Sequence, residues 1–185
     1  PLCLGDTDYG DVLPYKTWKN EKAMESAMSE LMRFGKKMFP GTQMSVYVPP
    51  SNVLSEQGRK MLAQKFPQIK TIASNYFAGE CAYTQEFEVA DDGIVEQPRI
   101  ISGAILDYMQ MAAVSELNMH FVNSHFMHPD DLLDEDRGAK LGWEKLKNRL
   151  EEYMDWLYDS APELRNLTGS ELSGAIERYG ALTYE

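Results

Sequence analysis

The chain has few of the residues that mark several protein classes. Only two of its 185 residues are cysteine, Cys3 and Cys81, which is too few for a disulfide framework or a zinc knuckle. Basic residues are outnumbered, since 18 Lys and Arg stand against 29 Asp and Glu and give a formal net charge of −11. No apolar run approaches the roughly 18 residues that a membrane span needs. We therefore expect no membrane span in this chain and no nucleic-acid partner, because an acidic surface repels phosphate backbones.

What the sequence does contain is typical of a globular protein, with 43% hydrophobic and 11% aromatic residues. A length of 185 residues fits one domain with its own core, so residues 1–185 are expected to form a single domain. Pro1 to Gly5 begin without methionine and resemble a strand already in progress, which predicts an excerpt of a longer protein. Any targeting signal would lie upstream, and the chain alone therefore indicates no compartment.

Helical and strand patterns alternate along the chain. Ser55 can cap one helix, and Thr168 with Glu171 has the spacing of a capping box at the start of the last one. This alternation predicts an α/β fold with parallel strands and crossover helices, either a barrel or an open sheet. Helices are expected near 20–38, 55–66, 102–117, 139–158 and after 168, and strands near 2–5, 44–48, 69–77, 99–101 and 119–123.

The segment 82–97 departs from this alternation. Tyr83 to Val89 alternates strictly between apolar and polar residues, Asp91-Asp92-Gly93 is a turn sequence, and Ile94-Val95 follows. These features predict a β-hairpin inserted as an excursion from the main sheet.

Polar loops follow the predicted strands. They comprise Asp6–Asp11, Pro49–Asn52, the region of Asn75 and Asn123–Asp131. In parallel α/β folds the loops after the carboxyl ends of the strands form the active face, so these loops are expected to converge on one site.

All three histidines of the chain lie between positions 120 and 128. His120 is expected inside a strand as a hydrogen-bonded core residue, with His125 and His128 in the loop after it. Two imidazoles and a carboxylate can hold a first-row metal ion and leave positions open for water, although these histidines could equally be surface loop residues. Asp130 and Asp131 complete the sequence His-Pro-Asp-Asp and add carboxylates beside the loop.

Asp6 and Asp8 are the natural partners of the histidines. Residues two apart on an extended segment face the same way, so both carboxylates can address one point, one as metal ligand and the other as base. The alternative is a solvated Asp-rich turn.

Five further residues are candidates for substrate contacts or for packing. Asn52, after two prolines, could bind sugar hydroxyls, and Trp18 could stack on a sugar ring. Arg99 could bind a carboxylate or orient a catalytic Asp, with a surface salt bridge as the default. Trp143 and Trp156 lie on a predicted helix and are expected to be packing residues.

Several segments together resemble a bacterial family of unknown function in the glycoside hydrolase/deacetylase superfamily, which includes polysaccharide deacetylases of the NodB-homology type. The resemblance implies an incomplete or irregular β/α barrel, here with the hairpin insertion. The segments are Gly-Asp-Thr-Asp-Tyr (5–9), Tyr-Val-Pro-Pro-Ser-Asn-Val-Leu-Ser (47–55), Pro-Arg-Ile-Ile-Ser-Gly (98–103), Ser-His-Phe-Met-His-Pro-Asp-Asp (124–131) and Leu-Arg-Asn-Leu-Thr-Gly-Ser-Glu (164–171).

Carried over residue by residue, the resemblance implies a site for Zn²⁺ or another divalent first-row metal. Asp8, His125 and His128 would be the metal ligands and Asp6 the general base, with Asp130 as a second catalytic carboxylate. The chain departs from the family pattern in that Thr7 splits the Asp pair and the two histidines are three residues apart rather than four.

The implied function is a metal-dependent hydrolase that removes acetyl groups from an envelope or extracellular polysaccharide, which would place the protein in the cell envelope or outside the cell. One alternative is a carbohydrate-binding or assembly domain without catalysis. Another is a glycoside hydrolase with paired carboxylates such as Asp8 and Asp130. A zinc deacylase of another class, using His-Pro-Asp-Asp directly, ranks last because no histidine follows His128.

Overall fold

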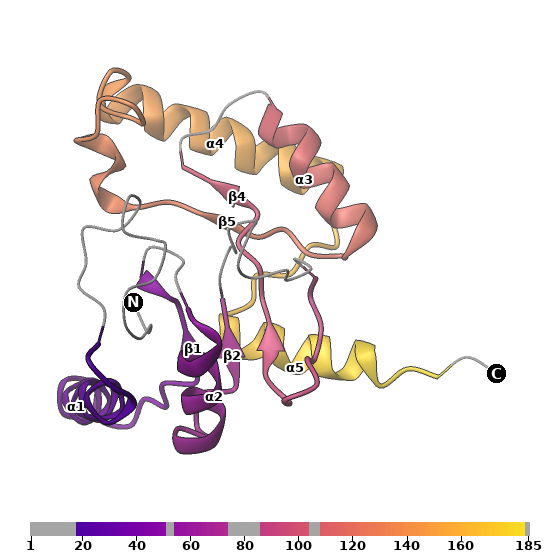
Figure 1. Ribbon diagram of the computed structural model, residues 1–185. Helices are drawn as coiled ribbons and strands as arrows, with labels where there is room; N and C mark the ends of the chain where they lie inside the picture. Colours follow the sequence, from indigo (N-terminus) through magenta and orange to yellow (C-terminus); the bar gives the residue numbers. More distant parts are fainter. Residues whose placement is uncertain (1–17, 51–53, 74–85, 104–107, 184–185) are drawn as a thin grey trace. The chain divides into compact units, whose positions relative to one another are not determined.

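The computed structural model describes residues 18–50, 54–73, 86–103 and 108–183. Within these ranges the chain is α/β, with five α-helices and two small parallel sheets (Figure 1). The predicted fold class and the parallel pairing of the strands are confirmed, and the described strands form no closed barrel. The chain divides into two compact units, of which unit 1 comprises residues 1–98 and 167–185 and unit 2 comprises residues 99–166.

Unit 1 is a three-stranded parallel sheet with the order β1-β2-β3 and three helices. Val46 pairs with Thr71, and Thr71 pairs with Val95. Its elements are α1 (Glu21–Met38), β1 (Val46–Tyr47), α2 (Glu56–Lys65), β2 (Thr71–Ile72), β3 (Val95–Glu96) and α5 (Gly169–Gly180).

Each helix of unit 1 begins at a residue that caps it. The Asn20 side chain accepts a hydrogen bond from Ala23 N at 2.9 Å, and Ser55 accepts one from Gly58 N at 3.1 Å. Thr168 and Glu171 form the predicted capping box, which satisfies backbone N–H groups at the start of α5. The sequence therefore located these three starts correctly.

Alternating strand residues of unit 1 face different helices, as the period of two in a strand requires. Tyr47 and Ile72 belong to a core cluster with α1 and α2 residues such as Met24 and Leu62. Thr71, next to Ile72, instead contacts Ser173 of α5 through its hydroxyl. Helices therefore cover both faces of this sheet.

The contact between α5 and the sheet is polar and close. Gln97 Nε2 donates to Ser173 Oγ at 2.8 Å and to the Gly169 carbonyl at 2.6 Å. A Cβ on Gly169 would lie 3.1 Å from Val46 Cγ2, which is tight for two carbon atoms, so glycine permits this approach. The small residues of α5 thus let the helix sit directly on β1 and β2.

The predicted hairpin forms but belongs to the sheet. Val89 and Val95 form an antiparallel bridge around the turn, where Gly93 has φ +80°. The second arm, Val95–Glu96, is β3 and pairs in parallel with β2. The expectation of an excursion outside the main sheet was therefore wrong for this arm, because its residues are fully buried within the sheet; residues 82–85 lie outside the described residues.

Unit 2 is a parallel pair of strands packed against two helices. Ile101 and Met109 form its core with Tyr153 and Leu157. Ile101 pairs with His125 across the strands. The elements are β4 (Ile101–Ser102), α3 (Tyr108–Met119), β5 (His125–Phe126), a 3₁₀-helix (Pro129–Leu132) and α4 (Gly142–Ser160).

The predicted strand at 119–123 was wrong. Helix α3 continues to Met119, and the chain leaves it through Phe121, whose φ is +59°. Met119 and Phe121 look like buried strand residues in the sequence but are 73% and 69% exposed. The strand begins two residues later, so His125 lies inside β5 and His120 follows a helix, with its Nδ1 3.4 Å from Glu116 Oε2.

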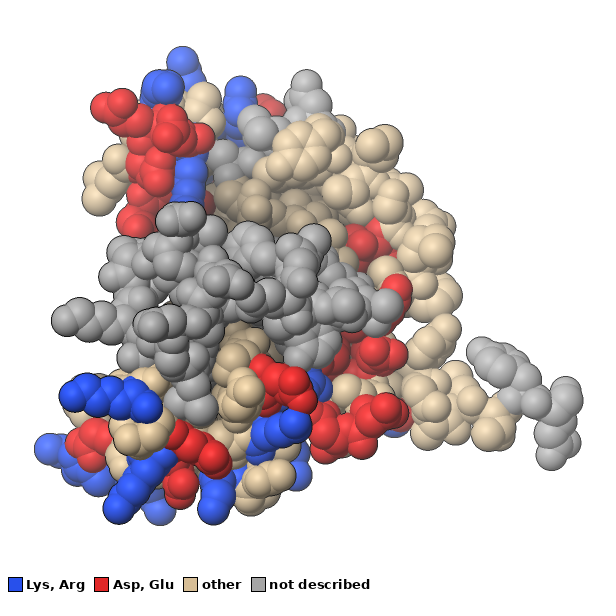
Figure 2. Space-filling view, in the orientation of Figure 1, with Lys and Arg blue, Asp and Glu red and all other residues tan. Residues whose placement is uncertain are grey.

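No helix in the described ranges is long and apolar enough to cross a membrane. On the face drawn in Figure 2, acidic and basic side chains interleave where α1 and α2 lie, and no continuous basic surface is visible.

Candidate functional site

The carboxyl ends of β4 and β5 lie at one edge of the unit 2 sheet because the strands are parallel. Gly103 follows β4 with φ +78°, and its N–H donates to the Phe126 carbonyl at 2.9 Å. The sequence Met127-His128 follows β5 directly and leads into the 3₁₀-helix. The edge therefore brings Gly103 and the segment after β5 together. The convergence of this segment with the loops at Asp6–Asp11, Pro49–Asn52 and Asn75 stays a prediction, because Asp6–Asp11, Ser51–Asn52 and Asn75 lie outside the described residues.

His125 lies on the face of β5 that the helices cover. Its ring meets the ring of Tyr153 edge-on at a centroid distance of 5.5 Å. Its Nε2 lies 3.0 Å from the Gly103 carbonyl, and because a carbonyl only accepts, Nε2 is the donor of this hydrogen bond. His125 is thus a packed and hydrogen-bonded histidine of the sheet edge.

Phe126, the next residue, faces the opposite side of the strand and carries a different set of contacts. The guanidinium of Arg99 lies 4.3 Å from the Phe126 ring centroid, and the His128 ring meets Phe126 edge-on at 5.4 Å. Beyond it, Arg137 Nη1 lies 3.2 Å from His128 Nδ1. We call Arg99, Phe126, His128 and Arg137 the His128 row. His125 and His128 thus point from opposite faces of the strand.

Asp131 binds Arg137, the last residue of the His128 row. It is 1% exposed, accepts from Arg137 Nη1 at 2.6 Å and accepts from His128 N at 3.2 Å. Burial alone would raise the pKa of Asp131, but the hydrogen bonds from Arg137 and His128 together bring it below its usual value. The same ion pair, with Asp134 and Asp130 nearby, raises the pKa of Arg137.

Asp130, the predicted catalytic carboxylate, is exposed in the 3₁₀-helix, whereas its neighbour Asp131 is buried. Asp6, Asp8 and Asn52 lie outside the described residues. Of the predicted site residues, the structure therefore brings Arg99 and His128 together and separates His125 from them.

Histidine, cysteine and carboxylate side chains are the candidate ligands for a metal ion. In the described ranges no three His, Cys, Asp or Glu side chains converge on one point. His125 and His128 do not fit as ligands of one ion in this arrangement, because they face opposite sides of β5. His128 is the remaining candidate ligand among the described residues, but its Nδ1 lies 3.2 Å from the Arg137 guanidinium and 3.7 Å from Asp131 Oδ1, so these residues alone do not form a metal site.

Two of the three tryptophans do not follow the prediction for them. Trp18, predicted as a sugar platform, is partly buried and packs against the unit 1 core. Trp156 packs on the unit 2 core as predicted. Trp143, predicted as a packing residue, is 59% exposed in the first turn of α4. The helix packs instead through Leu146, Tyr153 and Leu157.

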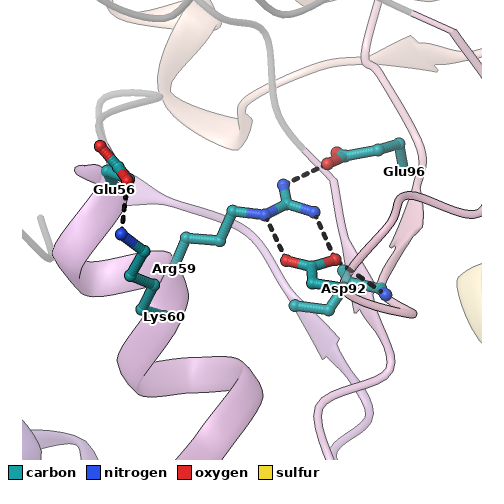
Figure 3. Close-up of polar contacts among 6 residues, drawn as sticks. Glu56, Arg59, Lys60, Asp92 and Glu96 are labelled. Atoms are coloured by element: carbon teal, nitrogen blue, oxygen red, sulfur yellow. Dashed lines mark hydrogen bonds and ion pairs between the residues drawn. The ribbon is translucent and has the colours of Figure 1, made fainter.

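A second buried charge cluster lies in unit 1 (Figure 3). Arg59 of α2 donates from Nε and Nη2 to Asp92 at 2.7 and 2.9 Å and also pairs with Glu96 of β3. Burial opposes ionisation of Asp92, yet the hydrogen bonds from Arg59 and Ile94 N lower its pKa. All charges in this cluster are used in tying α2 to the hairpin, so we assign it a structural role.

The family profile described as "Uncharacterised protein conserved in bacteria (DUF2194)" matches residues 9–184. The chain belongs to this family. No curated protein and no solved structure gives a significant match to it. The DUF2194 profile covers both units, and the wider deacetylase relationship remains a prediction.

Sequence reasoning named Asp131 in this DUF2194 chain only as a carboxylate beside the loop, without its role, and missed Arg137. That role could have been found, because Asp131 lies three residues after His128, which is the spacing of a carboxylate that bonds back to the first N–H of a helical turn. Arg137 gives no such signal, since it reaches His128 only after the chain folds back at Gly138, whose N–H bonds the Asp131 carbonyl at 2.8 Å.

Proposed function

We propose that the chain is a metal-dependent hydrolase of the polysaccharide deacetylase type, which removes acetyl groups from an envelope or extracellular polysaccharide. The observation that carries the proposal is His128 just after the carboxyl end of a parallel strand, with the buried carboxylate of Asp131 3.7 Å from its Nδ1. As part of the proposal, the parallel strands belong to an incomplete β/α barrel, whose active face lies at such strand ends.

His128 would hold the metal together with Asp8, the carboxylate ligand that the resemblance implies. When bound, a first-row ion lowers the pKa of a bound water and polarises the acetamide carbonyl. Asp6 would serve as the general base, and a carboxylic acid as the general acid toward the leaving amine. His125 would keep the sheet edge in place through Gly103, rather than bind the ion.

Metal content tests the proposal directly. Zinc-reconstituted protein is expected to retain about one zinc per chain by elemental analysis. His128→Ala should lose it, whereas His125→Ala should keep it because the His125 ring faces the other side of β5. Both variants are checked for folding by circular dichroism. Failure of the wild-type protein to retain zinc would contradict the metal-dependent mechanism.

A carbohydrate-binding or assembly role without catalysis is the second candidate. It is favoured by the Arg137 guanidinium, which donates to the one His128 nitrogen that faces Asp131. In that case the His128 row would offer sugars three polar side chains around the Phe126 ring, as carbohydrate and small-ligand sites use few but precisely placed donors. Oligosaccharide binding that persists in metal-free protein would support this role.

Trp143 is expected to serve saccharide binding in either role. Trp143→Ala should weaken binding of an N-acetylchitooligosaccharide about tenfold, because a lost ring-stacking contact costs about 1 kcal/mol or more. Isothermal titration measures the affinity, with Met111→Ala as the control because Met111 is an exposed apolar residue (74%) on α3 of the same unit. Equal affinities of wild type and Trp143→Ala would exclude Trp143 as a platform.

A further inference from the structure

Asp92-Gly93, in the turn of the unit 1 hairpin, is the only Asp-Gly pair of the sequence, which contains no Asn-Gly pair. Such pairs rearrange spontaneously, because glycine has no side chain to obstruct ring closure. The Gly93 nitrogen bonds to Asp92 Cγ, and the carboxyl hydroxyl leaves with the amide proton as water, which gives a five-membered succinimide. Water then adds to the main-chain carbonyl carbon of Asp92 and breaks its bond to the Gly93 nitrogen, so that the chain runs through Cγ as isoaspartate.

Both groups that would react are held in other contacts in the structure. Arg59 donates from Nε and Nη2 to the two carboxylate oxygens of Asp92 at 2.7 and 2.9 Å (Figure 3). Ile94 N donates to Asp92 Oδ1 at 3.1 Å. The Gly93 N–H, whose proton must leave in the reaction, donates to the Ala90 carbonyl at 2.8 Å. Ring closure would therefore have to break contacts on both sides of the new bond.

The contact to Arg59 also disfavours the reactive form of the carboxyl group. Ring closure proceeds from the protonated acid, because a carboxylate is a poor electrophile and would have to expel an oxide ion. Burial alone would raise the pKa of Asp92, but the hydrogen bonds from Arg59 and Ile94 N bring it below its ordinary value. The fraction of protonated Asp92 is therefore kept small.

Isoaspartate at this position would disturb the sheet of unit 1. It adds one methylene to the main chain inside a turn in which Ala90 N donates to the Ile94 carbonyl at 2.9 Å and Val89 bridges Val95. Val95 is fully buried and also pairs with Thr71 of β2. A longer turn cannot keep both the bridge and this parallel pairing in their present register.

We propose that Asp92-Gly93 is a modification site at which the chain can form isoaspartate, and that Arg59 suppresses this reaction by holding both oxygens of the Asp92 carboxylate. Arg59 thus preserves the covalent structure of the hairpin, in addition to tying α2 to it. This role is independent of the proposed hydrolase function.

The rate of isoaspartate formation at position 92 tests the inference. The two isomers have equal mass, and electron-transfer fragmentation of the peptide that spans Asp92 distinguishes them. Folded wild type is expected to react at least about tenfold more slowly than the same chain unfolded in guanidinium chloride, because the reaction requires local opening of the turn. Arg59→Met is expected to react about tenfold faster than folded wild type, since a rise of one unit in the pKa of Asp92 gives tenfold more protonated acid.

Leu62→Ala is the control for lost stability, because Leu62 is a fully buried residue of the same helix and its truncation leaves Arg59 in place. It should react at the rate of wild type while circular dichroism shows it folded. Equal rates in folded and unfolded wild type would overturn the inference, and so would an acceleration in Leu62→Ala as large as that in Arg59→Met.

Arg59→Lys covers the case in which Arg59→Met does not fold. Lysine keeps the positive charge but cannot bind both oxygens as the planar guanidinium does, so a rate above that of wild type is expected. An unchanged rate in folded Arg59→Lys would overturn the assignment to the guanidinium.

Discussion

Replacing Arg59 by alanine is expected to destabilise the protein by about 3 kcal/mol, because removing one partner of a buried ion pair leaves the other charge without compensation. The Arg59 side chain is 9% exposed and Glu96 is 8% exposed, so water cannot replace the lost contact to Glu96. Urea denaturation followed by circular dichroism measures the change. Hydrogen exchange in α2 and the 86–96 hairpin locates it, since Arg59 joins these two segments.

The matched control is Arg33→Ala. Arg33 also forms an ion pair, with Glu30 on the same helix, but both side chains are more than 60% exposed, so a much smaller change is expected than for Arg59→Ala. At acidic pH the difference in the free energy of unfolding between wild type and Arg59→Ala is expected to decrease. The folded-state pKa of Asp92 lies below its ordinary value of 3.8, so its contribution is complete above that pH and disappears as the pH falls through the folded-state pKa. Equal effects of the two alanine variants would contradict the structural role of the cluster.

Asp131→Ala is expected to cost about 2 kcal/mol, since it removes a charge-assisted hydrogen bond and a backbone contact from a buried position. The cost should be smaller than for Arg59→Ala because the freed Arg137 side chain is half exposed and can be hydrated. Faster hydrogen exchange is expected for residues 128–142, which fold around this carboxylate.

Asp134→Ala provides the comparison for Asp131, because Asp134 faces the same arginine at 3.5 Å but is 42% exposed. Its expected effect is within about 0.5 kcal/mol. The lowered pKa of Asp131 gives a pH dependence of the same sign as that of Asp92. The difference in the free energy of unfolding between wild type and Asp131→Ala should therefore decrease as the pH falls below the ordinary pKa of 3.8. An Asp134→Ala variant as unstable as Asp131→Ala would show that the loop depends on net charge and not on the buried carboxylate.

The helices and the class of fold could be read from the sequence because local signals decide them. Asn20, Ser55 and Thr168 mark helix starts by side-chain chemistry that acts within three residues. The strands are only two residues long in the structure, so they offer no period of their own to recognise. That is why the apolar residues near Phe121, which are exposed, were mistaken for a strand.

The site was harder to predict from the sequence because an error of one residue in a strand places each side chain on the opposite face of the sheet. His125 and His128 look equivalent as metal ligands on spacing alone. The start of β5 at His125 sends this ring toward Tyr153, and the ring of His128 toward Phe126. Arg137 enters the site through tertiary folding alone, and no local pattern encodes such a contact.

The arrangement of the two units along the chain has a consequence for biosynthesis. Unit 2 is one uninterrupted stretch, whereas unit 1 is completed only by residues after 166. During synthesis the β1-β2-β3 sheet would emerge early with α1 and α2 on one face. The contacts of Thr71 and Gln97 to Ser173 can form only after α5 has been made. The other face stays open until all of unit 2 has been made. We expect this interval, rather than the finished fold, to be when the chain is most exposed to aggregation.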